Sequence, residues 1–100
     1  MNNNVGTSFE FDYAVVDIAT DSATVRSGAA LLRGIYINTS LSAHDLPIYD
    51  GSTLVFTIPA TSAAGYWIPF GDLVFKTSLL IDPNNSATGG ITVIYKKRTP

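Results

Sequence analysis

The sequence predicts an all-β domain, either a compact antiparallel β-sandwich or a small jelly roll of about seven to nine short strands. Hydrophobic and polar residues alternate along most of the chain, turn-forming residues recur about every ten positions, and helical periodicity is nearly absent. A small barrel is the alternative, because its strands follow the same alternation. A chain of 100 residues is long enough to bury one such core.

The first three predicted strands differ in their burial. In "SFEFDYAVVD", residues 8–17, one face carries Phe9, Phe11, Tyr13 and Val15, and the other carries Glu10, Asp12 and Ala14. This alternation is typical of a half-buried strand. "ATVR" at 23–26 is a short second strand. "ALLRGIYIN" at 30–38 is apolar on both faces apart from Arg33, which predicts an interior strand, with Gly34 marking a bulge or a close approach of another backbone.

The stretch "LPIYDGSTLVFTIPA", residues 46–60, predicts a β-hairpin. Two apolar runs flank Asp50-Gly51, the pair favoured in a type I′ turn because both central residues need positive φ. Pro47 lacks an N–H, so its arm is either an edge strand or a strand with that position turned outward. Further strands are expected in "YWIPF" at 66–70, in "LVFK" at 73–76 after a turn at Gly71-Asp72, in "SLLID" at 78–82 and in "ITVIYKK" at 91–97.

Charge is sparse and unevenly placed. Charged residues make up 14% of the chain, against about 25% in ordinary soluble domains. The weakly charged surface suits a protein built into an assembly. Three of the six basic residues lie together near the end of the chain: Lys96, Lys97 and Arg98. They are expected to form either a solvated strand end or a contact for an acidic partner. The remaining three positive and eight negative side chains make the rest acidic, which argues against nucleic-acid binding.

Domain organisation is simple. Residues 8–98 are expected to form one β-sandwich domain, preceded by a flexible N-terminal arm, residues 1–7. The opening "MNNNVGTSFEF" lacks the features of a secretory signal, and no apolar run reaches the roughly 18 residues of a membrane helix. We therefore expect no membrane partner.

No motif in the chain indicates a reaction. There is no cysteine and one histidine, His44, so a metal site would depend on carboxylates. Neither a Gly-x-Ser-x-Gly elbow nor a glycine-rich phosphate loop is present. We expect no enzymatic activity, no catalytic residue, no metal and no cofactor.

The one aromatic concentration is "GYWIPF". Tyr66 and Trp67 are adjacent, so in a strand they point to opposite faces, and one is expected to be buried and the other exposed. An exposed ring either anchors an interface or stacks on a sugar ring, and the alternative is that both rings are covered within the sandwich.

From Leu31 onward the chain resembles small structural proteins of tailed-bacteriophage virions. The resemblance lies in the run "LLRGIYINTSLSAHDLPIYDGSTLVFTIPATSAAGYWIPFGDLVFKTSLLID" followed by "PNNSATGGITVIYKK". It covers about 70 residues, concerns the pattern rather than a diagnostic motif, and leaves residues 1–30 uncovered. It implies a head decoration (cement) protein on the capsid surface.

The expected function is therefore a structural one. The chain is expected to bind the outside of the shell formed by a major capsid protein and to stabilise that shell, as a homo-oligomer with a trimer favoured, because capsids offer three-fold positions. The candidate contacts are the arm residues Asn2, Asn3, Asn4 and Val5, together with Tyr66 and Trp67. The alternative is a carbohydrate- or receptor-binding tail or fibre module that uses Tyr66, Trp67, Asn84 and Asn85.

Overall fold

The computed structural model describes residues 11–20 and 24–98, and these residues form eight β-strands. The strands are β1 (Asp12–Asp17), β2 (Thr24–Arg26), β3 (Ala30–Thr39), β4 (Leu46–Asp50), β5 (Thr53–Ile58), β6 (Trp67–Phe75), β7 (Leu79–Ile81) and β8 (Gly90–Lys97). The predicted all-β class is confirmed. The arm, Phe9 and Glu10 lie outside the described residues.

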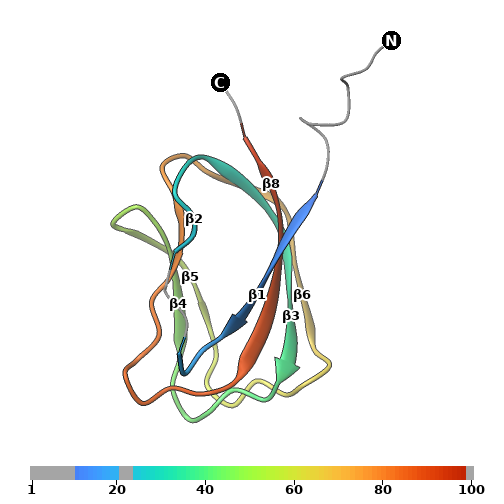
Figure 1. Ribbon diagram of the computed structural model, residues 1–100, viewed down its shortest axis with the longest axis vertical. Helices are drawn as coiled ribbons and strands as arrows, with labels where there is room; N and C mark the ends of the chain where they lie inside the picture. Colours follow the sequence, from blue (N-terminus) through green and yellow to red (C-terminus); the bar gives the residue numbers. More distant parts are fainter. Residues whose placement is uncertain (1–10, 21–23, 99–100) are drawn as a thin grey trace.

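The strands pair from the two ends of the chain inward, the first with the last and the second with the second to last, as in one long antiparallel hairpin. Antiparallel pairing joins β1 to β8, β2 to β7, β3 to β6 and β4 to β5. Two further pairings, β3 with β8 and β4 with β7, complete two sheets of order β1-β8-β3-β6 and β2-β7-β4-β5. Figure 1 shows these two sheets as facing layers. This arrangement is the jelly-roll form of the sandwich, and the two separate sheets exclude the single closed sheet of a barrel.

The core lies between the two sheets and is apolar. Alternate residues of each strand point inward, and no polar or charged residue is buried in the described part of the chain. At about 1.5–3 kcal/mol for each fully buried large side chain, this core is the main source of stability. The largest fully buried side chains are Phe75, Leu32, Ile35, Ile37, Leu46, Ile48, Ile58, Leu79, Ile81, Ile91 and Val93.

The 46–60 hairpin is confirmed, but its turn is centred one residue later than predicted. Asp50 pairs with Thr53, so the two loop residues are Gly51 and Ser52. Gly51 has a φ of 62°, whereas Ser52 is not among the residues with positive φ, which matches a type II′ turn rather than type I′. Asp50 is therefore the last residue of β4 and not a central residue of the turn, and its carboxylate accepts hydrogen bonds from the loop at 76–78.

β4 is an interior strand of its sheet, so Pro47 does not mark an edge. Its carbonyl oxygen accepts a hydrogen bond of 3.0 Å from the backbone N–H of Asp82, the residue that follows β7. The N and O of one strand residue point to the same side, so the missing N–H of Pro47 faces the place where β7 ends. The proline therefore costs no ladder bond within β7.

The predicted turn at Gly71-Asp72 is wrong, because β6 continues through it. Gly71 and Asp72 have φ values of 64° and 61°, and the register of β3 against β6 shifts opposite them, between Leu32 and Gly34. Two consecutive residues with positive φ make a bulge here rather than a reversal. The two strands expected at 66–70 and 73–76 are thus one strand.

Candidate functional site

The outer surface of the β1-β8-β3-β6 sheet is unusually apolar. Six of the nine large apolar side chains that are exposed in the described part of the chain lie on it. We call them the apolar face: Phe11, Tyr13, Val15, Tyr36, Trp67 and Val74. Tyr13 is 69% exposed and Val15 64% exposed. In a monomer, exposed apolar residues are usually scattered, so a collection of this kind marks a contact surface.

The outward direction of the β1 aromatics follows from its pairing with β8. Val16 lies opposite Ile91, and Ala14 lies opposite Val93, and both partners point into the core. The inward face of β1 therefore carries Ala14, Val16 and the residues in phase with them, and the larger side chains face out. Alternation predicted the half-buried strand, but the buried half is the one with the smaller side chains.

Trp67 lies on this face because Gly34 makes room for it. The two residues lie on the neighbouring strands β6 and β3, and a Cβ built on Gly34 would overlap the outer edge of the Trp67 ring. The same Cβ would stand 2.9 Å from the backbone oxygen of Ile68. The prediction that Gly34 marks a bulge or a close approach is confirmed on both counts.

Tyr66 and Trp67 are both exposed, by 58% and 41%, so the expectation that one of them is buried is wrong. β6 begins at Trp67, and Tyr66 belongs to the preceding turn, in which its N–H donates to the carbonyl of Ala63. Strand alternation does not govern a turn residue, so the two rings are free to be exposed together.

A charged cluster borders the apolar face at the end of β8. The Arg33 guanidinium donates two hydrogen bonds to the Asp72 carboxylate, at 2.8 and 3.1 Å. Its Cζ lies 4.2 Å from the centre of the Phe11 ring, and the Lys96 Nζ lies 4.6 Å from it. Lys96 Nζ is also 4.0 Å from Asp72. The two cations thus lie over the ring of Phe11, which stays 43% exposed, and they share one carboxylate.

These contacts favour the charged forms of both partners. The hydrogen bond from Arg33 lowers the pKa of Asp72, and the bond to Asp72 raises the pKa of Arg33. Because Lys96 lies over the Phe11 ring and near Asp72, its side chain is only 17% exposed. Lys96 thus packs on the protein surface and does not extend into solvent as a strand end.

The opposite border of the apolar face is polar and includes the acidic residue Asp17. Asn38 Nδ2 donates a 2.7 Å hydrogen bond to Thr92 Oγ1, on the outer side of β3 and β8. Beside this pair is a hollow of about 410 Å³, which extends from Val15 on β1 to Gly90 at the start of β8. The apolar face therefore continues into a shallow depression at this end.

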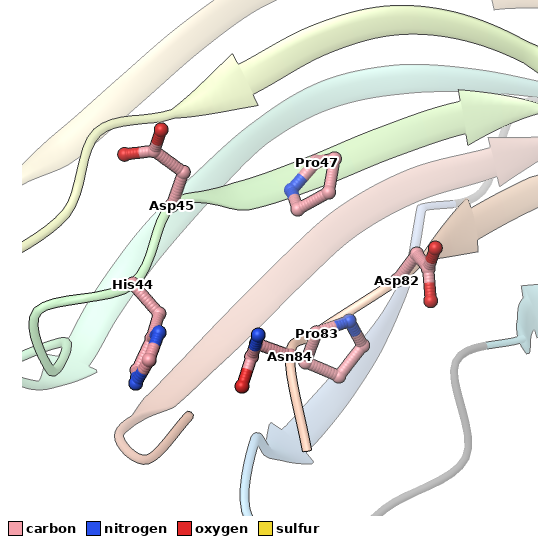
Figure 2. Close-up of a pocket in the computed structure, with 6 residues that line it drawn as sticks. All are labelled: His44, Asp45, Pro47, Asp82, Pro83 and Asn84. Carbon is pink, nitrogen blue, oxygen red and sulfur yellow. The ribbon is translucent and has the colours of Figure 1, made fainter. Parts of the chain in front are cut away.

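A second hollow, of about 390 Å³, lies among the loops at the same end of the sandwich (Figure 2). Its lining residues are His44, Asp45, Pro47, Asp82, Pro83 and Asn84. Asp45 accepts a 2.9 Å bond from the Ala60 N–H and so joins the loop before β4 to the one after β5, whereas Asn84 accepts a 2.8 Å bond from the Ser86 N–H within its own loop. In Figure 2 the Asp45 and Asp82 carboxylates lie on opposite sides of the hollow.

This hollow lacks the parts of a metal or sugar site. In residues 11–20 and 24–98, no three His, Cys, Asp or Glu side chains are placed to hold one metal ion. Asn84 was predicted to join Tyr66 and Trp67 in a sugar site, but neither of these two rings is among the six residues that line this hollow.

The sequence-predicted contact residues divide into two groups. Asn2, Asn3, Asn4 and Val5 lie outside the described residues, and Tyr66 and Trp67 are on the surface. Sequence reasoning missed Tyr13, Val15 and Tyr36. One available signal for Tyr36 was that β3 is apolar on both faces apart from Arg33, although a two-layer sandwich leaves one face of every strand outside.

No family model, no curated protein and no solved structure matches the chain. Among the described residues, no helix is long and apolar enough to cross a membrane. The described residues thus present an aromatic-rich sheet face with a charged cluster at one end.

Proposed function

We propose that this protein is a structural virion protein that binds the outside of a tailed-bacteriophage capsid and stabilises the shell, without enzymatic activity. The observation that carries the proposal is the apolar face, an exposed surface that an assembly would cover. The resemblance of the pattern from Leu31 onward to small phage virion proteins supports the same assignment.

The physical character of the domain suits this role. The core is wholly apolar in the described part of the chain, and short turns join β4 to β5 and β6 to β7, which favours a rigid block. The low overall charge reduces the repulsion between copies that crowd together on one shell. Rigidity and weak charge are properties that a repeated shell component requires.

We assign attachment to the major capsid protein to two elements: the arm residues Asn2, Asn3, Asn4 and Val5, and the exposed ring of Tyr66. Tyr66 lies in the 59–66 connection beside the end of β3, where its carbonyl accepts a hydrogen bond from the N–H of Ile37 and the N–H of Gly65 donates to the carbonyl of Ile37. Several weak contacts of this kind combine into firm attachment when one oligomer presents them together.

The test is to locate the protein in particles. Virions produced from the genome that encodes the chain are purified, its copy number is measured by quantitative mass spectrometry, and antibodies against it are imaged by immunogold labelling. We expect hundreds of copies per particle and label over the shell. Absence from purified particles would overturn the proposal, and label confined to the tail would replace it with the alternative.

The alternative is a carbohydrate- or receptor-binding tail or fibre module. One observation favours it: the Trp67 ring is held against Gly34 while 41% of the residue stays exposed, which is a suitable platform for a sugar ring. A glycan array probed with the wild-type chain and with Trp67→Ala tests this module. Hits that disappear in Trp67→Ala would support it, and an array without hits would remove it.

A further inference from the structure

We infer that a second copy of this chain covers the apolar face, with the two β1-β8-β3-β6 sheets packed against each other and their strands antiparallel. This pairing goes beyond the proposed role on a shell. It is tested on the purified full-length chain alone, so its failure and the failure of the shell role are distinguishable.

The first argument is area. The six side chains of the apolar face are between 41% and 69% exposed. Taking about 150–250 Å² for a large side chain when fully exposed, they present on the order of 600 Å² of surface per copy. Two such faces in contact remove on the order of 1,200 Å², which reaches the lower end of the range for specific stable interfaces.

The second argument is the composition of the face. Between the charged cluster at Arg33 and the polar pair at Asn38, the outward positions of the four strands are uncharged: Tyr13, Val15, Thr92, Ile94, Tyr36, Trp67 and Pro69. Tyrosine and tryptophan are enriched at the centres of protein interfaces, and charged residues are depleted there. A sheet face is also broad enough to meet a copy of itself, because stacked sheets pack about 10 Å apart.

The third argument is the distribution of charge between the two ends of the sandwich. The half where β8 ends holds six described basic residues and three described acidic ones, a formal +3: Arg26, Arg33, Lys76, Lys96, Lys97 and Arg98 against Asp12, Asp50 and Asp72. The other half holds Asp17, Asp45 and Asp82 and no described Lys or Arg, a formal −3. Along its strands, the described part of the molecule is therefore a dipole.

This dipole selects the direction of packing. Two identical faces meet through a two-fold axis that lies in the plane of contact, either along the strands or across them. An axis along the strands places the two basic ends side by side, and an axis across the strands places each basic end beside the partner's acidic end. Coulomb attraction favours the second arrangement. A three-fold assembly with strands along its axis also brings like ends together, so the charges favour a two-fold pair over the trimer expected from capsid symmetry.

The first experiment measures self-association by sedimentation equilibrium of the wild-type chain and two variants. Tyr13→Lys/Val15→Lys places two charges in the apolar face at positions more than 60% exposed, where the fold itself tolerates them. Leu54→Lys is the matched control, since Leu54 is 53% exposed on β5, in the other sheet. We expect a wild-type dimer, a dimer of Leu54→Lys, and at least a 100-fold weaker association of the double variant.

Three outcomes would overturn the pairing: a wild-type monomer or trimer, a double variant that dimerises as the wild type does, or equal loss of association in Leu54→Lys. Circular dichroism of each variant shows whether it has kept its fold. If the double variant unfolds, the single variant Tyr36→Lys on β3 gives the same comparison on a different strand.

The second experiment determines the direction of packing by cross-linking. The chain has no cysteine, so single cysteines can be placed at Asn38 and at Val74 without background. Val74 on β6 pairs with Leu31 on β3, and Leu31 is seven residues from Asn38 on the same strand. Positions 38 and 74 are therefore about 23 Å apart along the strand direction. When the two variants are mixed and treated with a short bismaleimide, antiparallel packing predicts cross-links mainly between position 38 and position 74. A majority of 38–38 and 74–74 products would exclude it.

Discussion

The indole of Trp67 occupies the space that a side chain on Gly34 would need. A Cβ at Gly34 would overlap the ring and stand 2.9 Å from the backbone oxygen of Ile68. A glycine in the middle of a strand ordinarily weakens it, because glycine has no side chain to pack and loses more entropy on folding. Here its missing side chain allows the largest ring of the apolar face to lie close against the sheet.

Gly34→Ala is therefore expected to lower the free energy of unfolding by about 1–3 kcal/mol, because the ring and the neighbouring strand must both shift. Urea unfolding measures the loss. Trp67 is the only tryptophan, so a change in its fluorescence emission would report its displacement directly. The matched control is Gly90→Ala on β8, where a new Cβ meets nothing closer than 3.4 Å, and a loss as large as that of Gly34→Ala would contradict this explanation.

Asp50 joins the β4–β5 hairpin to the loop between β6 and β7. Its carboxylate accepts hydrogen bonds from the backbone N–H groups of Lys76, Thr77 and Ser78, at 2.9, 2.8 and 3.3 Å. The bond from Lys76, followed by those from the next two residues, lowers the pKa of Asp50. Asp50→Asn keeps only one acceptor oxygen, and we expect it to be less stable than the wild type at pH 7.

The pH dependence has a definite sign. A carboxyl whose pKa is lower in the folded state stabilises the fold above the unfolded pKa of about 4, and this contribution is lost as the pH falls through the lowered value. The difference between wild type and Asp50→Asn, measured by thermal unfolding from pH 7 to pH 2.5, should thus shrink below about pH 4. A constant difference would exclude a titrating Asp50, and Asp82→Asn, which keeps the backbone bond to Pro47, serves as the control.

Phe56 and Phe70 face each other across the open side of the sandwich. Phe56 lies on β5 and Phe70 on β6, the edge strands of the two sheets, and their ring centres are 5.0 Å apart with an interplanar angle of 89°. A double-mutant cycle with Phe56→Leu and Phe70→Leu should give a coupling energy of about 0.5–1.5 kcal/mol in chemical denaturation. Phe56→Leu combined with Gly90→Ala is the control cycle, and coupling there equal to that of the ring pair would refute a specific edge contact.

Deletion of residues 1–7 tests the arm. If the arm attaches the protein to a shell, the truncated chain should bind less tightly to capsids that lack the protein, and its melting temperature should stay nearly the same, because strand β1 begins at Asp12. Co-sedimentation with such capsids measures the binding. Equal binding of the truncated and complete chains would exclude the arm as an attachment element.

The sequence alone predicted strand positions well where alternation and turn residues agreed. The 46–60 hairpin and the interior strand at 30–38 were predicted from residues close together in the chain, and the glycine within a strand pattern marked Gly34, although the ring that it accommodates, Trp67, lies on another strand. The turn expected at Gly71-Asp72 failed because the same two residues can form a bulge. Only the long partner strand β3 shows that the chain continues straight through them.

What residue order by itself determined is the all-β class, because a period of two and regular turn signals are properties of the chain. Tertiary structure decided which half of each strand is exposed. Alternation divides β1 into two faces without saying which is buried, and only the register of Val16 against Ile91 turns Tyr13 and Val15 outward. The pairings of β3 with β8 and with β6 bring residues of β3 and β6 to the same surface. An interaction face of this kind is a property of strand register, which links residues far apart in the sequence.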